Sequence, residues 1–307
     1  MKILLTGGAG FIGSNLTKRL VNEGHSVVVL DNLLRGNKIE KDIFEKIDFR
    51  LGDVRDAQFV NDAAKGCDVI IHFAAVLGVD VVADNPVETM DVEVIGTRNV
   101  VMAAHANNVK KIMYASTSGI YGHSAFENVL TEEVLVDPRT SYAMAKRYNE
   151  IYLASHHDEK GIDIVSLRFF NVYGYNQDNR MVVPRFFEQA LKGEKITVFG
   201  TGMQTRDFTY IDDTVESCIR LLNVKGCHIV NIANEEEWCI KDLADQIKEI
   251  TQSNSELTYV EAPSKRYDYE VERRVGSSSK LFEITQYKPD TKLYDGLAKI
   301  HAINYTK

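Results

Sequence analysis

The chain has 307 residues, which is enough for one large domain or two modest ones. Its composition, 44% apolar and 26% charged, is that of a globular protein with a substantial core. The net charge of -8 and the mixing of both signs along the chain exclude a basic nucleic-acid-binding surface, so an anionic ligand would need locally placed arginines.

The four cysteines point to a reducing compartment. Cys67, Cys218, Cys227 and Cys239 show no CxxC spacing and no histidine cluster near them. We therefore expect reduced thiols in a cytoplasmic protein, with no metal site and no disulfide framework. The apolar run at residues 3–5 is too short for a signal peptide or a membrane span, so no membrane association is expected.

Taken in chain order, the first half alternates short apolar runs with amphipathic segments. The runs predict strands at residues 3–6, 27–31, 47–51, 69–73, 112–116 and 164–169. The amphipathic segments predict helices at residues 12–23, 86–107 and 142–159. Strands that are apolar throughout and alternate with helices are typical of a parallel sheet covered on both faces. The expected fold class is α/β, with a Rossmann-type doubly wound parallel sheet.

The pattern weakens after Asn171. Strands are predicted at residues 196–199 and 228–233, and helices at 184–192 and 240–251. We expect a smaller C-terminal α/β substrate lobe, made of residues 171–207 and 236–307. The main domain would be residues 1–170, with 208–235 returning to it. Helical segments 86–107 and 141–158 could pair across a homodimer, or could simply cover the sheet.

A glycine-rich loop joins the first predicted strand to the first helix. Residues 6–13 read Thr-Gly-Gly-Ala-Gly-Phe-Ile-Gly, which contains both GxxGxxG and GxGxxG. Glycines permit the tight turn and the close approach of a pyrophosphate, while the helix N-terminus offers free N–H groups. The loop between strand and helix, with an acid at the next strand end, predicts a dinucleotide site. Its expected cofactor-binding residues are Gly7, Gly10, Phe11, Ile12 and Gly13.

The acid at the end of the second predicted strand is Asp31. A carboxylate there accepts hydrogen bonds from the adenine ribose and repels a 2′-phosphate, which favours NAD over NADP. Asn32 follows it in the predicted site. Arg35 lies close enough to keep NADP open as an alternative.

Two later segments extend the predicted cofactor site. Asp53 and Val54 follow the third strand, where Asp53 would reach the adenine amino group. Ala74 and Ala75 follow the fourth strand, where small residues let a dinucleotide lie against the sheet edge. His72 beside them is expected to be a packed, hydrogen-bonded histidine rather than a catalyst.

Tyr142 and Lys146 form a YxxxK pair, which a helix places one turn apart on the same face. A free tyrosine has a pKa near 10, too high for a base at neutral pH. A neighbouring ammonium and a positively charged nicotinamide ring favour the phenolate. Thr117, at the end of the fifth strand, would bridge the substrate oxygen and Tyr142. These three residues are the predicted catalytic set. Tyr142 and Lys146 are also expected to bind the cofactor, Lys146 through the nicotinamide ribose.

At this point the chain resembles the extended short-chain dehydrogenase/reductase family, in its nucleotide-sugar epimerase and dehydratase group. The resemblance covers nearly the whole chain. It rests on TGGAGFIG (6–13), DN (31–32), GDVRD (52–56), HFAA (72–75), GTRNV (96–100), STSGIYG (116–122), YAMAK (142–146), LRFFNVYG (167–174), VVPRF (182–186) and GTGMQTRDFTYIDD (200–213).

The resemblance implies further site residues. Asn171 would contact the sugar diphosphate, and Val183 lies in a stretch that lines the nucleotide pocket. Arg206 and Arg273 would clamp the diphosphate, because a fork of fixed N–H donors suits bidentate phosphate recognition. The implied ligand is a nucleotide-diphosphate sugar, with UDP as the expected nucleotide, bound beside NAD.

The chain departs from two patterns of that family. Sugar 4,6-dehydratases carry Asp-Glu directly after the catalytic threonine, and sugar-acid decarboxylases often carry a glutamate in the same stretch; here Ser118 and Gly119 stand there. Near the C-terminus, Ser277 replaces the usual aspartate. The favoured function is therefore 4-epimerisation of a UDP-hexose through a 4-keto intermediate. The alternatives are a UDP-N-acetylhexosamine dehydratase or 5-epimerase, then a sugar-acid decarboxylase or a non-catalytic nucleotide-binding regulator.

Overall fold

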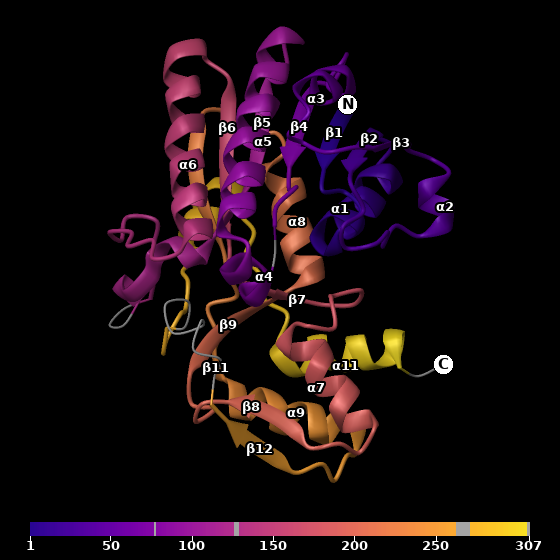
Figure 1. The fold of residues 1–307 in the computed structure, drawn as a ribbon, viewed down its shortest axis with the longest axis vertical. Helices are drawn as coiled ribbons and strands as arrows, with labels where there is room; N and C mark the ends of the chain where they lie inside the picture. The colour runs from indigo at the N-terminus through magenta and orange to yellow at the C-terminus, as the bar shows by residue number, and fades with distance from the viewer. Residues whose placement is uncertain (77, 126–128, 262–270, 306–307) are drawn as a thin grey trace.

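A parallel sheet organises the larger part of the molecule (Figure 1). The computed structural model describes residues 1–76, 78–125, 129–261 and 271–305. Within them, seven strands pair in the order β10-β6-β5-β4-β1-β2-β3, all parallel. In chain order they are β1 (Lys2–Thr6), β2 (Ser26–Asp31), β3 (Asp48–Leu51), β4 (Val69–His72), β5 (Lys111–Thr117), β6 (Asp163–Phe169) and β10 (Cys227–Ile232).

Helices cover both faces of this sheet because the strand residues are apolar on both sides. Ile3 and Leu5 face one apolar cluster and Leu4 faces the other. On the first face lie α1 (Phe11–Asn22), α2 (Lys41–Phe44) and α8 (Ile211–Leu221). On the second lie α3 (Ala57–Ala63), α5 (Pro86–Ala106) and α6 (Ser141–Lys160), with α5 and α6 side by side in Figure 1. The expected Rossmann-type fold is confirmed.

The second lobe lies below the sheet in Figure 1. One small sheet has the order β11-β9-β7 and another pairs β12 with β8. The strands are β7 (Asn171–Tyr173), β8 (Ile196–Phe199), β9 (Thr205–Tyr210), β11 (Glu237–Cys239) and β12 (Leu257–Val260). The helices beside them are α7 (Val182–Leu191), α9 (Ile240–Thr251) and α11 (Leu293–Asn304).

Four shorter elements complete the described fold. They are α4 (Val79–Asp84), the 3-10 segment η1 (Ser118–Ala125), α10 (Ser279–Thr285) and an isolated bridge between Leu130 and Gly276. In the described part of the chain, no helix is long and apolar enough to cross a membrane.

One apolar core joins the two lobes. The cluster that includes Leu5 of β1 and Val215 of α8 continues through Phe186 of α7 and Leu243 of α9 to Leu297 of α11. Segment 208–235 contributes α8 and β10 to the larger lobe, because β10 pairs with β6 and α8 packs on α1. The exact division of the chain into two domains stays a prediction.

Candidate active site and cofactor cleft

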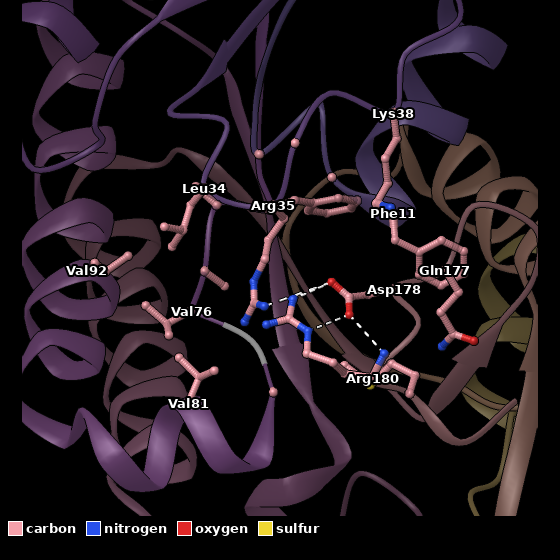
Figure 2. Close-up of a pocket in the computed structure, with 18 of the residues that line it drawn as sticks. Phe11, Leu34, Arg35, Lys38, Val76, Val81, Val92, Gln177, Asp178 and Arg180 are labelled. Atoms are coloured by element: carbon pink, nitrogen blue, oxygen red, sulfur yellow. Dashed lines mark hydrogen bonds and ion pairs between the residues drawn. The ribbon is translucent and has the colours of Figure 1, made fainter. Parts of the chain in front are cut away.

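A cavity of about 430 Å³ lies where the carboxyl ends of β1, β2 and β4 face the second lobe. Ligands of doubly wound folds bind at this edge of the sheet. Figure 2 shows Phe11 and Leu34 on its Rossmann side and Gln177 and Arg180 on its other side. The predicted residues that line it are Gly7, Gly10, Phe11, Asp31, Asn32, Asp53, Val54, Ala74, Ala75, Asn171 and Arg206.

The glycine-rich loop leaves no room for side chains. A Cβ at Gly7, whose φ is +70°, would lie 2.6 Å from the backbone nitrogen of Ala74. A Cβ at Gly13 would lie 2.1 Å from the carbonyl oxygen of Gly7. Helix α1 begins at Phe11, and its N-cap, Gly10, supplies no side-chain hydrogen bond to the first turn. The N–H groups of that turn are therefore available to an anion at the positive end of the helix dipole.

Asp31, at the end of β2, is hydrogen-bonded to this loop. Its Oδ2 accepts a hydrogen bond from the backbone N–H of Ala9 at 3.0 Å, and its Oδ1 accepts one from Leu33 at 2.8 Å. Burial raises the pKa of the Asp31 carboxyl, and these two bonds oppose the rise. Arg35, the residue that kept NADP open, turns across the cavity toward Asp178, with 3.9 Å between the charged atoms (Figure 2).

Asp53 lines the cavity, whereas His72 is not part of its lining. Asp53 is paired with Arg55 at 2.7 Å, and hydrogen bonds from that guanidinium hold the pKa of the Asp53 carboxyl low. His72 is buried, as expected, and bonds to the hydroxyls of Thr6 at 2.7 Å and Thr97 at 3.1 Å. Burial lowers the pKa of His72 to about 3, so its imidazole is neutral.

The structure brings the predicted catalytic residues together at the end of β5, although none of them belongs to the cavity lining named above. Thr117 ends β5, and its side chain lies beside Tyr142. Tyr142 and Lys146 lie on the first two turns of α6, with the Lys146 Nζ 5.4 Å from the centre of the Tyr142 ring. Lys146 is buried and donates to the carbonyl of Ala115 at 2.7 Å. Burial raises the pKa of Tyr142, and the neighbouring hydroxyl of Thr117 lowers it.

Two guanidinium groups meet on the second-lobe side of the cavity. Arg206 of β9 and Arg274 both line it. Burial and the neighbouring charge of Arg206 lower the pKa of Arg274 to about 9. The Nε of Arg274 is buried and has no hydrogen-bond partner among the described residues. Two like charges with an unsatisfied donor form a place for an anion.

Comparison with known proteins identifies the chain. The model of the NAD dependent epimerase/dehydratase family matches residues 3–233. The chain belongs to this family. It is 33% identical to a UDP-N-acetyl-alpha-D-glucosaminuronate decarboxylase of Bacillus cytotoxicus, over 96% of this chain and 95% of that one. It is 34% identical to a putative UDP-glucose 4-epimerase of Methanocaldococcus jannaschii, over 99% and 98%.

A solved structure agrees with the assignment. The complex of Thermus thermophilus UDP-glucose 4-epimerase with NAD superimposes with a TM-score of 0.89, at 30% identity, over 98% of this chain and 97% of that one. The chain is thus an NAD-dependent enzyme of a family that modifies nucleotide sugars. The residues present fit this cofactor, because the glycine cradle, the uncapped start of α1 and Asp31 suit a pyrophosphate and a ribose.

Besides the three catalytic residues, four predicted residues lie outside the cavity lining. Ile12 and Gly13 lie within α1, where Gly13 packs against the loop. Val183 is buried in α7 and borders a second, smaller cavity. Arg273 is ion-paired with Glu237 of β11 at 2.9 Å, while its neighbour Arg274 lines the main cavity. A diphosphate role for Arg273 stays a prediction.

Sequence reasoning missed two functional candidates in this family member, Arg274 and Glu93. Residues 272–274 run beside β9, where the N–H of Asp207 donates to the Arg274 carbonyl at 3.0 Å. Which of two adjacent arginines faces the cavity depends on that register, so sequence alone does not decide it. For Glu93, the sequence does contain a signal of a buried polar residue. Glu93 stands between Thr89 and Thr97 in a stripe of polar residues spaced four apart on α5, all fully buried.

Asp31 yields a first prediction, that the apo-protein binds NAD at least about tenfold more tightly than NADP, because the carboxylate repels a 2′-phosphate. Isothermal titration with both cofactors measures this. The double substitution Asp31→Ala/Asn32→Arg should narrow the difference, and equal affinities for the unmodified protein would contradict the assignment.

Proposed function

We propose that this enzyme inverts C4 of a UDP-hexose through a transient 4-keto sugar. The observation that carries the proposal is the content of the stretch after β5. Thr117, Tyr142 and Lys146 lie together, whereas the two residues that follow Thr117 are Ser118 and Gly119. The Gly119 N–H donates to the Thr117 hydroxyl at 3.1 Å, so this turn holds the threonine in place without adding a carboxylate.

Each of these residues would have a distinct role in the reaction. Tyr142 takes the proton of the sugar 4-hydroxyl and later returns it, with Thr117 orienting the same oxygen. NAD, when bound, accepts the C4 hydride and gives it back. Asn171, Arg206 and Arg274 hold the diphosphate while the hexose turns over, so that binding energy remote from C4 serves the chemistry there. No acid or base beyond Tyr142 is required.

Decarboxylation is the second candidate, and the Bacillus cytotoxicus relative favours it. That reaction also passes through oxidation at C4, which the same three residues would serve. Dehydration or 5-epimerisation needs a group that removes the C5 proton, and the positions after Thr117 supply none. These routes differ in their products, so a single set of incubations separates them.

The test is to incubate the pure protein with UDP-, GDP- and dTDP-sugars, uronic acids included, in heavy water. A mass-neutral change at C4 supports the proposal. Release of CO₂, with a solvent deuteron taking the place of the carboxylate at C5, means decarboxylation. Loss of water, or deuterium at C5 without release of CO₂, means a dehydratase or 5-epimerase. Products are identified by mass spectrometry and NMR.

We also propose a homodimer formed through α5 and α6. Large apolar side chains are exposed on these adjacent helices, namely Met90, Ile95, Met102, Met144, Tyr148 and Ile151. Light scattering should give about twice the 34.6 kDa chain mass. Ile151→Glu should yield a monomer, whereas Leu135→Glu, at a more exposed apolar residue elsewhere, should not. A monomeric unmodified protein would contradict this interface. The cytoplasmic location stays a prediction.

A further inference from the structure

A buried carboxylate lies behind the catalytic pair. The Oε2 of Glu93, on α5, is 2.9 Å from the Nζ of Lys146, on α6, and both side chains are almost completely excluded from solvent, at 0% and 1% exposure. The same oxygen lies 3.4 Å from the hydroxyl of Tyr114. Asn149 donates to that hydroxyl at 2.9 Å and to the Glu93 carbonyl at 3.0 Å. The ion pair is therefore held in one geometry by a polar cluster.

Stability alone does not explain this buried ion pair, because burying two charges costs free energy. Removing two charges from water carries a large free-energy cost, and apolar residues of similar volume stabilise many proteins equally well or better. Burial raises the pKa of the Glu93 carboxyl, and the interactions with Lys146 and the backbone of Val76 oppose that rise. A buried pair in contact with a catalytic lysine is better explained by its effect on that lysine.

We propose that Glu93 is a positioning residue: its carboxylate fixes the ammonium of Lys146 and offsets most of its charge at Tyr142. This inference rests on the proposed role of Tyr142 and adds a group to it. The Lys146 Nζ has three N–H donors, of which one reaches the Ala115 carbonyl and one reaches Glu93. The third remains for the ribose of the cofactor, so Glu93 sets the direction in which Lys146 presents it.

The charges around Tyr142 come from several elements. Lys146 on α6 favours the phenolate, and Glu93 on α5 opposes it, because its negative charge raises the pKa of Tyr142. Tyr114 on β5 lies under the Lys146 ammonium, 4.8 Å from Nζ to the ring centre, and its own pKa is raised by burial. His72 on β4 is neutral, and Glu150 on α6 is bound by Arg168 at 2.9 Å. Glu93 is thus the group whose charge directly balances Lys146.

The test measures the ionisation of Tyr142 without any sugar. The NAD-bound protein is labelled with ¹³Cζ-tyrosine, and the Tyr142 signal is assigned by its loss in Tyr142→Phe. In Glu93→Gln, which keeps the size of the side chain but removes its charge, the titration of Tyr142 should move down by about 1–3 pH units. Glu93→Asp retains the charge and should titrate near the unmodified protein. Asp91→Asn removes an exposed charge from the same helix and should move the signal little.

The outcomes separate this inference from the proposed function. If Glu93→Gln binds NAD and melts normally but leaves the Tyr142 titration in place or moves it upward, Glu93 does not offset Lys146 and the proposal is overturned. If Glu93→Gln does not fold, Glu93→Asp and Glu93→Ala provide the test. Tyr142 should titrate near its usual pH in Glu93→Asp, which keeps the charge, and at lower pH in Glu93→Ala, which removes it. A failure to convert any sugar would contradict the proposed reaction alone, because no step of the titration uses one.

Discussion

Tyr142→Phe is expected to lower turnover by about 10²–10⁴-fold, the contribution of a positioned acid or base. The substitution removes the hydroxyl that Thr117 contacts but keeps the ring beside Lys146, so folding and NAD binding should survive. Steady-state turnover on the accepted sugar, with NAD binding by titration calorimetry, measures both effects. Near-normal turnover of Tyr142→Phe would overturn the assignment and place the acid and base elsewhere in the site.

The pH dependence of turnover provides a second test of the role of Tyr142. The phenolate is the form that accepts a proton, so turnover should rise with pH through the pKa of Tyr142. Burial and the negative charge of Glu93 raise that pKa. The ammonium of Lys146, 5.4 Å from the centre of the Tyr142 ring, favours the phenolate. Lys146→Ala should therefore move the profile to higher pH and weaken NAD binding as well. Thr117→Val should cost less than Tyr142→Phe, because the hydroxyl orients the oxygen and does not carry the proton away.

Arg274→Ala is expected to weaken UDP binding by about 2–4 kcal/mol, the cost of breaking a desolvated charge pair. That loss corresponds to a rise in Kd of roughly 30- to 700-fold. Arg206→Ala should act in the same way, because the two guanidinium groups lie close enough for the charge of Arg206 to lower the pKa of Arg274. Titration calorimetry with UDP measures the loss, and the affinity for NAD should be unchanged.

Arg273→Ala is the matched control. The residue is adjacent in sequence, has the same charge and is already paired with Glu237. Its substitution should leave UDP affinity close to that of the unmodified protein. The reverse pattern, a loss in Arg273→Ala and none in Arg274→Ala, would restore the assignment made from the sequence and remove Arg274 from the clamp.

The main sheet and its helices could be predicted because their signals are local and strong. Apolar runs mark the strands, so the predicted strands at 27–31 and 164–169 lie within β2 and β6. In the second lobe, the predicted boundaries of 196–199 and 240–251 coincide with β8 and α9. The short strands β9 and β11 were not predicted. Their sequences, Thr205–Tyr210 and Glu237–Cys239, mix polar and apolar residues, and their pairing joins segments far apart in the chain.

The candidate site likewise contains some residues that the sequence predicts and others that it does not. Tyr142 and Lys146 are one helical turn apart, so the sequence brings them together without knowledge of the fold. Glu93 meets Lys146 only because α5 packs on α6, and its identity as an ion-pair partner needs that packing. Arg274 depends on the register of an extended segment beside β9. The spacing of Thr89, Glu93 and Thr97 marks a buried polar stripe, but no spacing in the sequence identifies the partner that Glu93 meets on another helix.

The apolar core shared by the two lobes restricts how the enzyme can move. Leu5, Val215, Phe186 and Leu297 belong to one continuous cluster, so a hinge that swung the lobes apart would expose that surface to water. The lobes therefore act as a rigid body, and access to the cleft depends on loops at its mouth, such as the one carrying Asp178 and Arg180. In the 4-epimerisation proposed above, the two lobes would therefore stay fixed, and the hexose itself would rotate between giving up its hydride and receiving it on the opposite face.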